Sequence, residues 1–143
     1  MLRPARLLGL ALAAAALACG GDEPPVTSTM SLGQTYTDWF YAGRVDDMRG
    51  RFTPELQGAF GTRDSLRLYH ERTVGELGRE TGAAREEITE AGPMQVYARV
   101  AAFERAPDPM LLEWAIDSAG AISGFVLRPA PGDAGDAAGD SAQ

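Results

Sequence analysis

Apolar residues in the first half of the chain recur with the period of an α-helix. Spacings of i, i+4, i+7 and i+8 predict a helix that ends at Ala42–Gly43, with one apolar stripe formed by Leu32, Tyr36, Trp39 and Phe40. A second amphipathic stretch follows, with apolar positions at Val45, Met48 and Phe52. Both segments are therefore predicted to be helices that bury one face.

Cap residues mark the ends of two further helices. The pair Thr53–Pro54 combines an N-cap with a proline at the first helical position, and it predicts a short helix that stops at Gly61. The next helix is capped by Thr62 or Asp64 and closes at Gly78. The apolar face of this last helix is formed by Leu66, Tyr69, Thr73 and Leu77.

In the second half of the chain, apolar and polar residues alternate with the period of a β-strand. Strands are predicted over residues 94–103, 110–116 and 122–128, the last after a hairpin turn at 117–120. One face of the first strand carries Met94, Val96, Ala98, Val100 and Ala102, and one face of the second carries Met110, Leu112, Trp114 and Ile116. Residues 86–90 are a weaker candidate, with one apolar residue, suited to a sheet edge.

Helices followed by an antiparallel meander of three to four strands indicate the α+β class, with the helices on one face of the sheet. One small domain is expected over residues 30–129, which hold every aromatic residue of the 143-residue chain. Residues 19–29 are expected to form a flexible tether, because they are rich in Gly, Pro and acidic residues. Residues 130–143 lack large apolar side chains, which predicts a disordered acidic tail.

The order of these elements and two stretches of sequence resemble an uncharacterised bacterial domain of the nuclear transport factor 2-like superfamily. The stretches are Arg51–Leu56 (RFTPEL) and Ile116–Phe125 (IDSAGAISGF), the second followed by Arg128–Pro129. The resemblance covers about residues 30–129 and implies a cone, in which helices pack into a curved antiparallel sheet. Such domains occur alone in lipoproteins or ahead of α/β-hydrolase or β-lactamase-related domains, and the resemblance implies no catalytic residue.

The N-terminus has the composition of a secretory signal. Two arginines precede an apolar run over residues 7–17, which is shorter than the roughly 20 residues of a membrane-spanning helix. Ala16–Cys19 (ALAC) resembles the lipobox of bacterial lipoproteins, which implies a signal peptide over residues 1–18 and acylation of Cys19. The alternative is an ordinary signal peptide with a chance cysteine.

A lipobox predicts a lipid-anchored protein of the cell envelope. Gly20–Gly21 follow the cysteine in place of the aspartate that retains some lipoproteins on the inner membrane. In a bacterium with two membranes, the expected location is therefore the outer membrane, facing the periplasm.

Composition excludes several kinds of chemistry. The formal charge is −7, and it becomes −9 when residues 1–18 are removed with their two arginines, so nucleic-acid binding is disfavoured. The chain has no lysine for Schiff-base chemistry, and its single cysteine, Cys19, leaves no thiol nucleophile or disulfide. One histidine cannot form a multi-histidine zinc or iron site. No metal or cofactor is expected.

Six side chains are candidates for lining a pocket for a small apolar ligand: Trp39, Tyr69, His70, Tyr97, Trp114 and Phe125. The alternative for the aromatic residues is that they fill the core, and both tryptophans are expected on inward faces. His70 could act as a general base in a cone pocket, or it could be a packed or surface histidine that is hydrogen-bonded to a neighbour.

Four acidic residues are candidate general bases, with a solvated surface position as the alternative for each: Asp38, Asp46, Asp47 and Glu113. No serine lies in a G-x-S-x-G nucleophile elbow. The expected function is therefore a non-enzymatic, membrane-anchored domain that binds a small ligand or an envelope protein. One alternative is a small cone enzyme of isomerase or dehydratase type, which an Asp or His within hydrogen-bond reach of a tyrosine and pointing into a cavity would indicate. The other is an accessory domain to a separate hydrolase.

Overall fold

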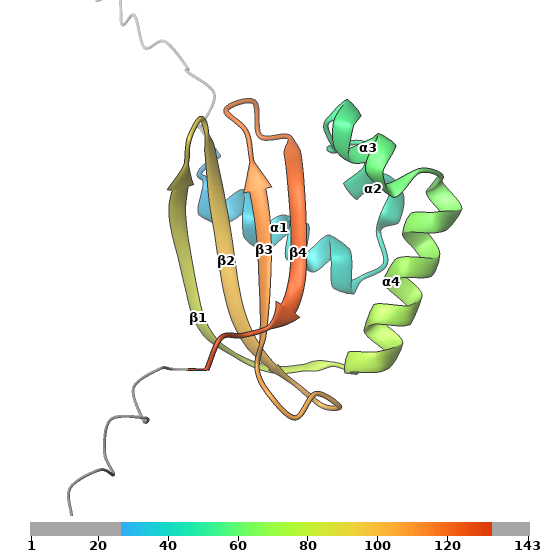
Figure 1. Ribbon diagram of the computed structural model, residues 1–143, viewed down its shortest axis with the longest axis vertical. Helices are drawn as coiled ribbons and strands as arrows, with labels where there is room; N and C mark the ends of the chain where they lie inside the picture. Colours follow the sequence, from blue (N-terminus) through green and yellow to red (C-terminus); the bar gives the residue numbers. More distant parts are fainter. Residues whose placement is uncertain (1–26, 133–143) are drawn as a thin grey trace, which may run out of the picture.

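Four helices precede four strands in the described part of the chain, residues 27–132 of the computed structural model (Figure 1). The helices are α1 (Thr29–Tyr41), α2 (Val45–Arg49), α3 (Pro54–Phe60) and α4 (Arg63–Leu77). The strands are β1 (Glu80–Ala91), β2 (Met94–Phe103), β3 (Met110–Ile116) and β4 (Ile122–Pro129). The predicted class, a single small α+β domain with its helices first, is confirmed.

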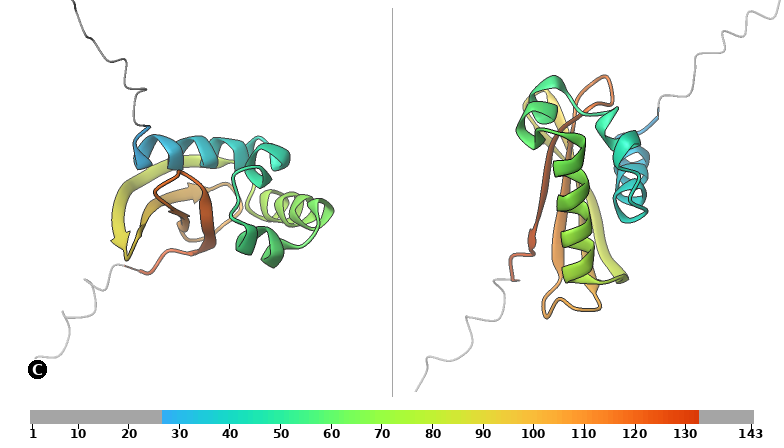
Figure 2. Two further views of the ribbon diagram at one scale, coloured as in Figure 1. Left: turned by 90° about the horizontal axis from the view of Figure 1, so that it is seen from above. Right: turned by 90° about the vertical axis from the view of Figure 1, so that its right-hand side faces the viewer.

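The strands form one antiparallel meander in the order β1-β2-β3-β4. Seen from above, the sheet is curved, α1 lies across one of its faces, and α3 and α4 lie to the side of β4 (Figure 2). The strand register places Tyr97, Trp114 and Phe125 in one row across β2, β3 and β4. This row of rings faces the helices and forms the floor of the core.

Cap residues determine the helix ends. Ser28, Thr53 and Thr62 are the N-caps of α1, α3 and α4, and each side-chain oxygen accepts a hydrogen bond from a backbone N–H three residues on. Helices α3 and α4 end at Gly61 and Gly78, each with a φ of 71° that suits glycine. The predicted start at Thr53 and both predicted glycine stops are confirmed.

The predicted signal peptide, Cys19 and most of the predicted tail lie outside the described residues. Helix α1 begins at Thr29, so it includes the last residue of the predicted tether. Within residues 27–132, no helix combines the length and the apolar composition needed to cross a membrane.

Strand β1 is longer than the sequence predicts. It covers 12 residues, Glu80–Ala91, where the prediction has residues 86–90. The strand pairs with β2 along this length, with two register shifts, and lies at an edge of the sheet as predicted. The predicted length is wrong because backbone pairing with β2, rather than an apolar pattern of its own, holds this polar segment in a strand.

The residues predicted to share one face of β2 do share one face. The structure also shows which way that face points. The predicted set, from Met94 to Ala102, faces away from α1. The opposite set packs toward the helices and includes the buried residues Tyr97, Ala101 and Phe103. Large rings therefore line the helix-facing side of this strand, and small aliphatic residues line the other.

The core lies between the helices and this side of the sheet. Its most fully buried large side chains are Trp114, Tyr36, Tyr97, Phe40, Met48, Leu66, Leu112, Ile116 and Ile122. Helix α1 approaches β2 most closely at Gly33, where a Cβ atom would lie 2.1 Å from Cγ of Tyr97. Trp39 differs from Trp114, because it is only partly buried and the Arg44 guanidinium lies 4.9 Å from its ring centre.

Candidate functional site

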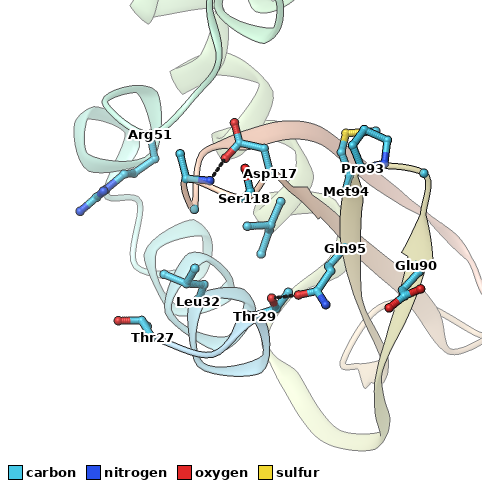
Figure 3. Close-up of a pocket in the computed structure, with 14 residues that line it drawn as sticks. Thr27, Thr29, Leu32, Arg51, Glu90, Pro93, Met94, Gln95, Asp117 and Ser118 are labelled. Atoms are coloured by element: carbon cyan, nitrogen blue, oxygen red, sulfur yellow. Dashed lines mark hydrogen bonds between the residues drawn. The ribbon is translucent and has the colours of Figure 1, made fainter. Parts of the chain in front are cut away.

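An open groove of about 690 Å³ lies at the end of the domain where α1 begins. The first turn of α1 forms one wall, and two hairpin turns, Gly92–Pro93 and Asp117–Gly120, form the others (Figure 3). Polar and apolar side chains both contribute to the lining, among them Thr29, Leu32, Met94, Gln95 and Ile116. The groove therefore has an apolar floor and a polar rim.

Hydrogen bonds fix the walls of this groove. The Thr29 hydroxyl donates to Oε1 of Gln95 and so joins α1 to β2 (Figure 3). The Asp117 carboxylate accepts hydrogen bonds from backbone N–H groups two and four residues further on, at 2.9 and 2.8 Å. The Tyr36 hydroxyl, which comes from the core, donates to the carbonyl of Gly120. Both the helix and the β3–β4 turn are thus held in place before any ligand binds.

A smaller groove of about 290 Å³ lies between α2 and α4. Its charged side chains are already paired: Arg44 lies 2.8 Å from Asp47, and Arg63 forms an ion pair with Asp46. All four side chains are about half exposed or more, so these pairs add little stability. The positive and negative charges around the smaller groove therefore balance, so it is neither a cation site nor an anion site.

His70 also lines the smaller groove. Its ring packs edge-on against Phe40, with ring centres 5.4 Å apart, and its Nε2 atom is buried without a hydrogen-bond partner among the described residues. A general base needs an open path to the proton it removes and a group that orients its ring. The histidine is packed, as the alternative predicts, but in the described part of the chain its Nε2 atom lacks the hydrogen bond to a neighbour that the alternative also predicts.

The other five candidate pocket residues lie in or near the core. Tyr97 and Trp114 are 0% exposed and line neither groove. Tyr69 on α4 and Phe125 on β4 are partly buried and pack against each other, with ring centres 6.1 Å apart. Trp39 is partly buried on α1. The sequence pattern identified large buried side chains, but it did not identify which surfaces are hollow.

Aromatic rings fill the space between the helices and the sheet. The Trp114 ring stacks on Phe125 at 4.3 Å and lies edge-on to Tyr36 and Phe40 at 6.2 and 6.3 Å. Its Nε1 donates a hydrogen bond of 3.0 Å to Oγ1 of Thr37, which satisfies both buried polar groups. Side chains thus occupy the space between α1 and the sheet around Trp114.

Sequence reasoning missed a polar cluster on the helix-facing side of β1 and β2. The Arg99 guanidinium donates to Glu80 at 2.6 and 3.2 Å and also to Glu86. The Tyr97 hydroxyl donates to the same Glu86 carboxylate at 2.5 Å, and Gln34 of α1 donates to it at 3.1 Å. The available signal was an arginine within a mostly apolar strand, but its partners are apparent only from the β1–β2 register.

The charges in this cluster stabilise one another. Burial, together with the hydrogen bond to Glu86, raises the pKa of Tyr97 to about 12. The hydrogen bond from Tyr97, together with those from Gln34 and Arg99, lowers the pKa of the Glu86 carboxyl below its ordinary value of 4.5. Because Tyr97 is fully buried and Arg99 is paired with Glu86, neither group is presented to a substrate.

The cluster predicts that the domain loses stability at acid pH. A group whose pKa is lowered by folding adds stability above its unfolded pKa, and that stability is lost as the pH falls through its folded pKa. The free energy of unfolding is therefore expected to fall as the pH drops below the ordinary value of 4.5, and to fall less steeply in Glu86→Gln. Denaturant unfolding at several pH values between about 7 and about 3 measures both slopes. Equal slopes in both proteins would contradict the prediction. The control is Glu87→Gln, which changes the exposed glutamate next to Glu86.

The four acidic residues that are candidate general bases all lie at the surface or in ion pairs. Asp38 is exposed, and Asp46 and Asp47 pair with arginines. Glu113 faces away from the helices, 3.7 Å from Arg128. Among the described residues, no group of three His, Cys, Asp or Glu side chains is placed to hold a metal ion.

No protein-family model, no curated protein and no solved structure matches this chain. The resemblances to lipoproteins and to nuclear transport factor 2-like domains therefore remain proposals. The function has to be argued from the geometry of this domain.

Proposed function

We propose that this protein is a non-enzymatic, lipid-anchored binding domain of the bacterial cell envelope, with a nuclear transport factor 2-like fold. The filled interior supports this proposal best. The rings of Tyr36, Phe40, Trp114 and Phe125 pack together where a cone-shaped isomerase or dehydratase would keep its reaction chamber. A protein partner then binds on the outer surface.

The hydrogen-bonded pair of Glu86 and Tyr97 is the arrangement that would favour an enzyme. Two observations weigh against that reading. The pair lines neither groove, and the Arg99 guanidinium holds the Glu86 carboxylate in an ion pair. A general base needs access to the proton of a bound substrate, and this carboxylate has no adjoining cavity among those described.

The groove at the start of α1 is the surface that suits a partner best. It is open rather than enclosed, and two hairpin turns border it, so it can receive an extended polypeptide segment laid between them. Leu32 and Met94, which are both partly exposed in it, can contact an apolar side chain. The formal charge of −9 that remains after removal of residues 1–18 favours a basic partner, and the charged side chains that line the groove are two acids, Glu90 and Asp117, and one base, Arg51. We therefore assign the groove to an extended basic segment of an envelope protein.

Selection from a library of displayed random peptides tests this assignment. The full chain is expected to select peptides that are rich in Arg and Lys and whose affinity falls as salt is raised. The variant Ser118→Trp places a large ring at an exposed position of the groove and is expected to weaken these peptides about tenfold or more. Selected peptides that bind this variant equally well, or a failure to select any peptide, would contradict the assignment.

A matched control introduces the same ring elsewhere. Leu68 is 61% exposed on α4 and lines neither groove, so Leu68→Trp is expected to leave peptide affinity unchanged. An equal loss of affinity in both variants would mean that added surface apolarity, rather than groove filling, disturbs the binding.

The proposed anchor has a separate test at Cys19. Two or more acyl chains, each contributing about 0.8 kcal/mol per buried methylene, hold a protein stably on a membrane where one chain does not. Cys19→Ala is therefore expected to move the protein from the membrane fraction to the soluble fraction, as measured by quantitative immunoblotting after cell fractionation. An unchanged amount in the membrane fraction would contradict the lipoprotein proposal.

A further inference from the structure

Helices α3 and α4 contain glycines that the packing does not require. A Cβ atom added at Gly58 in α3 or at Gly75 in α4 would meet no atom within 4 Å. At Gly33 in α1, by contrast, it would collide with the Tyr97 ring. Glycine inside a helix lowers helix stability relative to alanine, because the unfolded backbone has more freedom to lose. Both helices therefore give up stability without a packing gain.

The α3–α4 segment is joined to the rest of the domain mainly at its two ends. Before α3, the backbone of Arg51 and Thr53 bonds to Ile122 at 2.7 and 2.9 Å. After α4, the Leu77 carbonyl accepts a hydrogen bond of 3.0 Å from the N–H of Arg105. Between these ends, no hydrogen bond in the described part of the chain links α3 or α4 to a strand. Side chains make the other links: Gln57 donates to the carbonyls of Arg49 and Phe52, Arg63 pairs with Asp46, and Arg105 donates to the carbonyl of Gly75.

Few side chains of this segment are fully buried, although Leu56, Phe60, Tyr69 and Val74 pack against the core as partly buried residues. Helix α3 has no buried residue, and α4 has two, Leu66 and Thr73. The views agree that both helices lie beside β4 rather than across the sheet (Figures 1 and 2). Segments with few buried contacts are the first to open in a folded domain.

The inner side of the α3–α4 segment covers a run of rings. Phe60 lies 5.7 Å from Tyr69, and Tyr69 stands perpendicular to Phe125 at 6.1 Å. Phe125 is in turn stacked on Trp114, with ring centres 4.3 Å apart and planes inclined by 28°. Removal of Tyr69 would therefore uncover Phe125 while Trp114 still supports it from the other side.

We propose that residues 54–77 form a lid that opens by local unfolding and admits a flat, uncharged aromatic ring against Phe125. The ligand ring would take the place of Tyr69 beside the Phe125–Trp114 stack, where an offset-stacked or edge-on arrangement is favourable. This site is separate from the groove at the start of α1 and goes beyond the proposed function.

Hydrogen exchange of the full chain tests the opening. Backbone amides in α3 and α4 are expected to exchange much faster than those in β2. Gly58→Ala and Gly75→Ala restore helix propensity, so each is expected to lower the open population about 2–5-fold, and the two together about 5–30-fold. Gly82→Ala in β1 is the matched control, because a Cβ atom there also meets nothing within 4 Å but lies outside the lid.

Titration with the neutral fluorescent dye N-phenyl-1-naphthylamine tests the ligand site. Saturable binding is expected, and its affinity should weaken in the double alanine variant by the same factor as the open population, because binding requires opening. Phe125→Leu, which removes the ring face, should also weaken the dye, whereas Gly82→Ala and the groove variant Ser118→Trp should not.

Three outcomes would overturn the proposal. They are exchange in α3 and α4 as slow as in β2, a dye affinity unchanged by Gly58→Ala with Gly75→Ala, and loss of dye binding in Ser118→Trp. The last outcome would place the dye in the groove. Since peptide selection at the groove uses a different probe, a failure of the lid leaves the proposed function standing.

Discussion

Replacing Trp114 with alanine is expected to lower the free energy of unfolding by about 3–5 kcal/mol. Its ring is 0% exposed and stacks on Phe125, with Tyr36 and Phe40 edge-on to it. Truncation removes these contacts, leaves a cavity between α1 and the sheet, and takes the donor away from buried Thr37. A loss of this size is a large share of the stability of a small domain.

Denaturant unfolding followed by far-ultraviolet circular dichroism measures this loss without relying on tryptophan fluorescence. Trp39→Ala is the matched comparison, since Trp39 is partly exposed and its outer contact is the Arg44 guanidinium. Its truncation is expected to cost about 1 kcal/mol, because less apolar surface returns to water. Similar small losses in both variants would mean that the core around Trp114 is hollow or hydrated, which would weaken the argument against an internal reaction chamber.

The two tryptophans illustrate what periodicity can and cannot predict. Helical and strand spacing placed both on inward faces, and both do contact the core. Spacing within one element does not show which position lies over the middle of the sheet. That depends on the strand register, which places Trp114 between Tyr97 and Phe125, and on the angle at which α1 crosses the strands.

Helix ends were predictable because they are decided within a few residues. Thr53 caps α3 through a hydrogen bond to a backbone N–H three positions on, and Gly61 and Gly78 take a backbone conformation that suits glycine. Such signals need no knowledge of the rest of the fold. The α+β class followed from them and from the strand alternation.

Features formed by distant segments were not predictable. Strand β1 is polar and is held by pairing with β2, so a pattern of apolar residues underestimates its length. The cluster around Arg99 needs that same register to bring two glutamates to one guanidinium. The larger groove joins the start of α1 to two turns far along the chain, Gly92–Pro93 and Asp117–Gly120, and no local motif marks it.

The close approach of α1 to β2 is a further long-range feature, and it depends on one glycine. Gly33 is buried in the middle of α1, where glycine is a poor helix former, and a Cβ atom there would lie 2.1, 2.5 and 2.6 Å from three atoms of the Tyr97 side chain. Real Cβ atoms do not tolerate such distances, so either the ring or the helix would have to move. Tyr97 is fully buried and bonded to Glu86, which leaves it little room.

Gly33→Ala is therefore expected to lower the free energy of unfolding by about 3 kcal/mol or more, at the upper end for overpacking of a core. In a Tyr97→Ala background, the same change should cost less than about 1 kcal/mol, because the atoms that it would strike are gone. Gly75→Ala, also inside a helix but in open space, should instead stabilise the domain by roughly 0.5–1 kcal/mol. Denaturant unfolding of the wild type, Gly33→Ala, Tyr97→Ala and the double variant completes the double-mutant cycle, and Gly75→Ala is measured beside them. Equal costs of Gly33→Ala in both backgrounds would show that Tyr97 does not enforce this glycine, and that α1 sits farther from β2 than the packing described here requires.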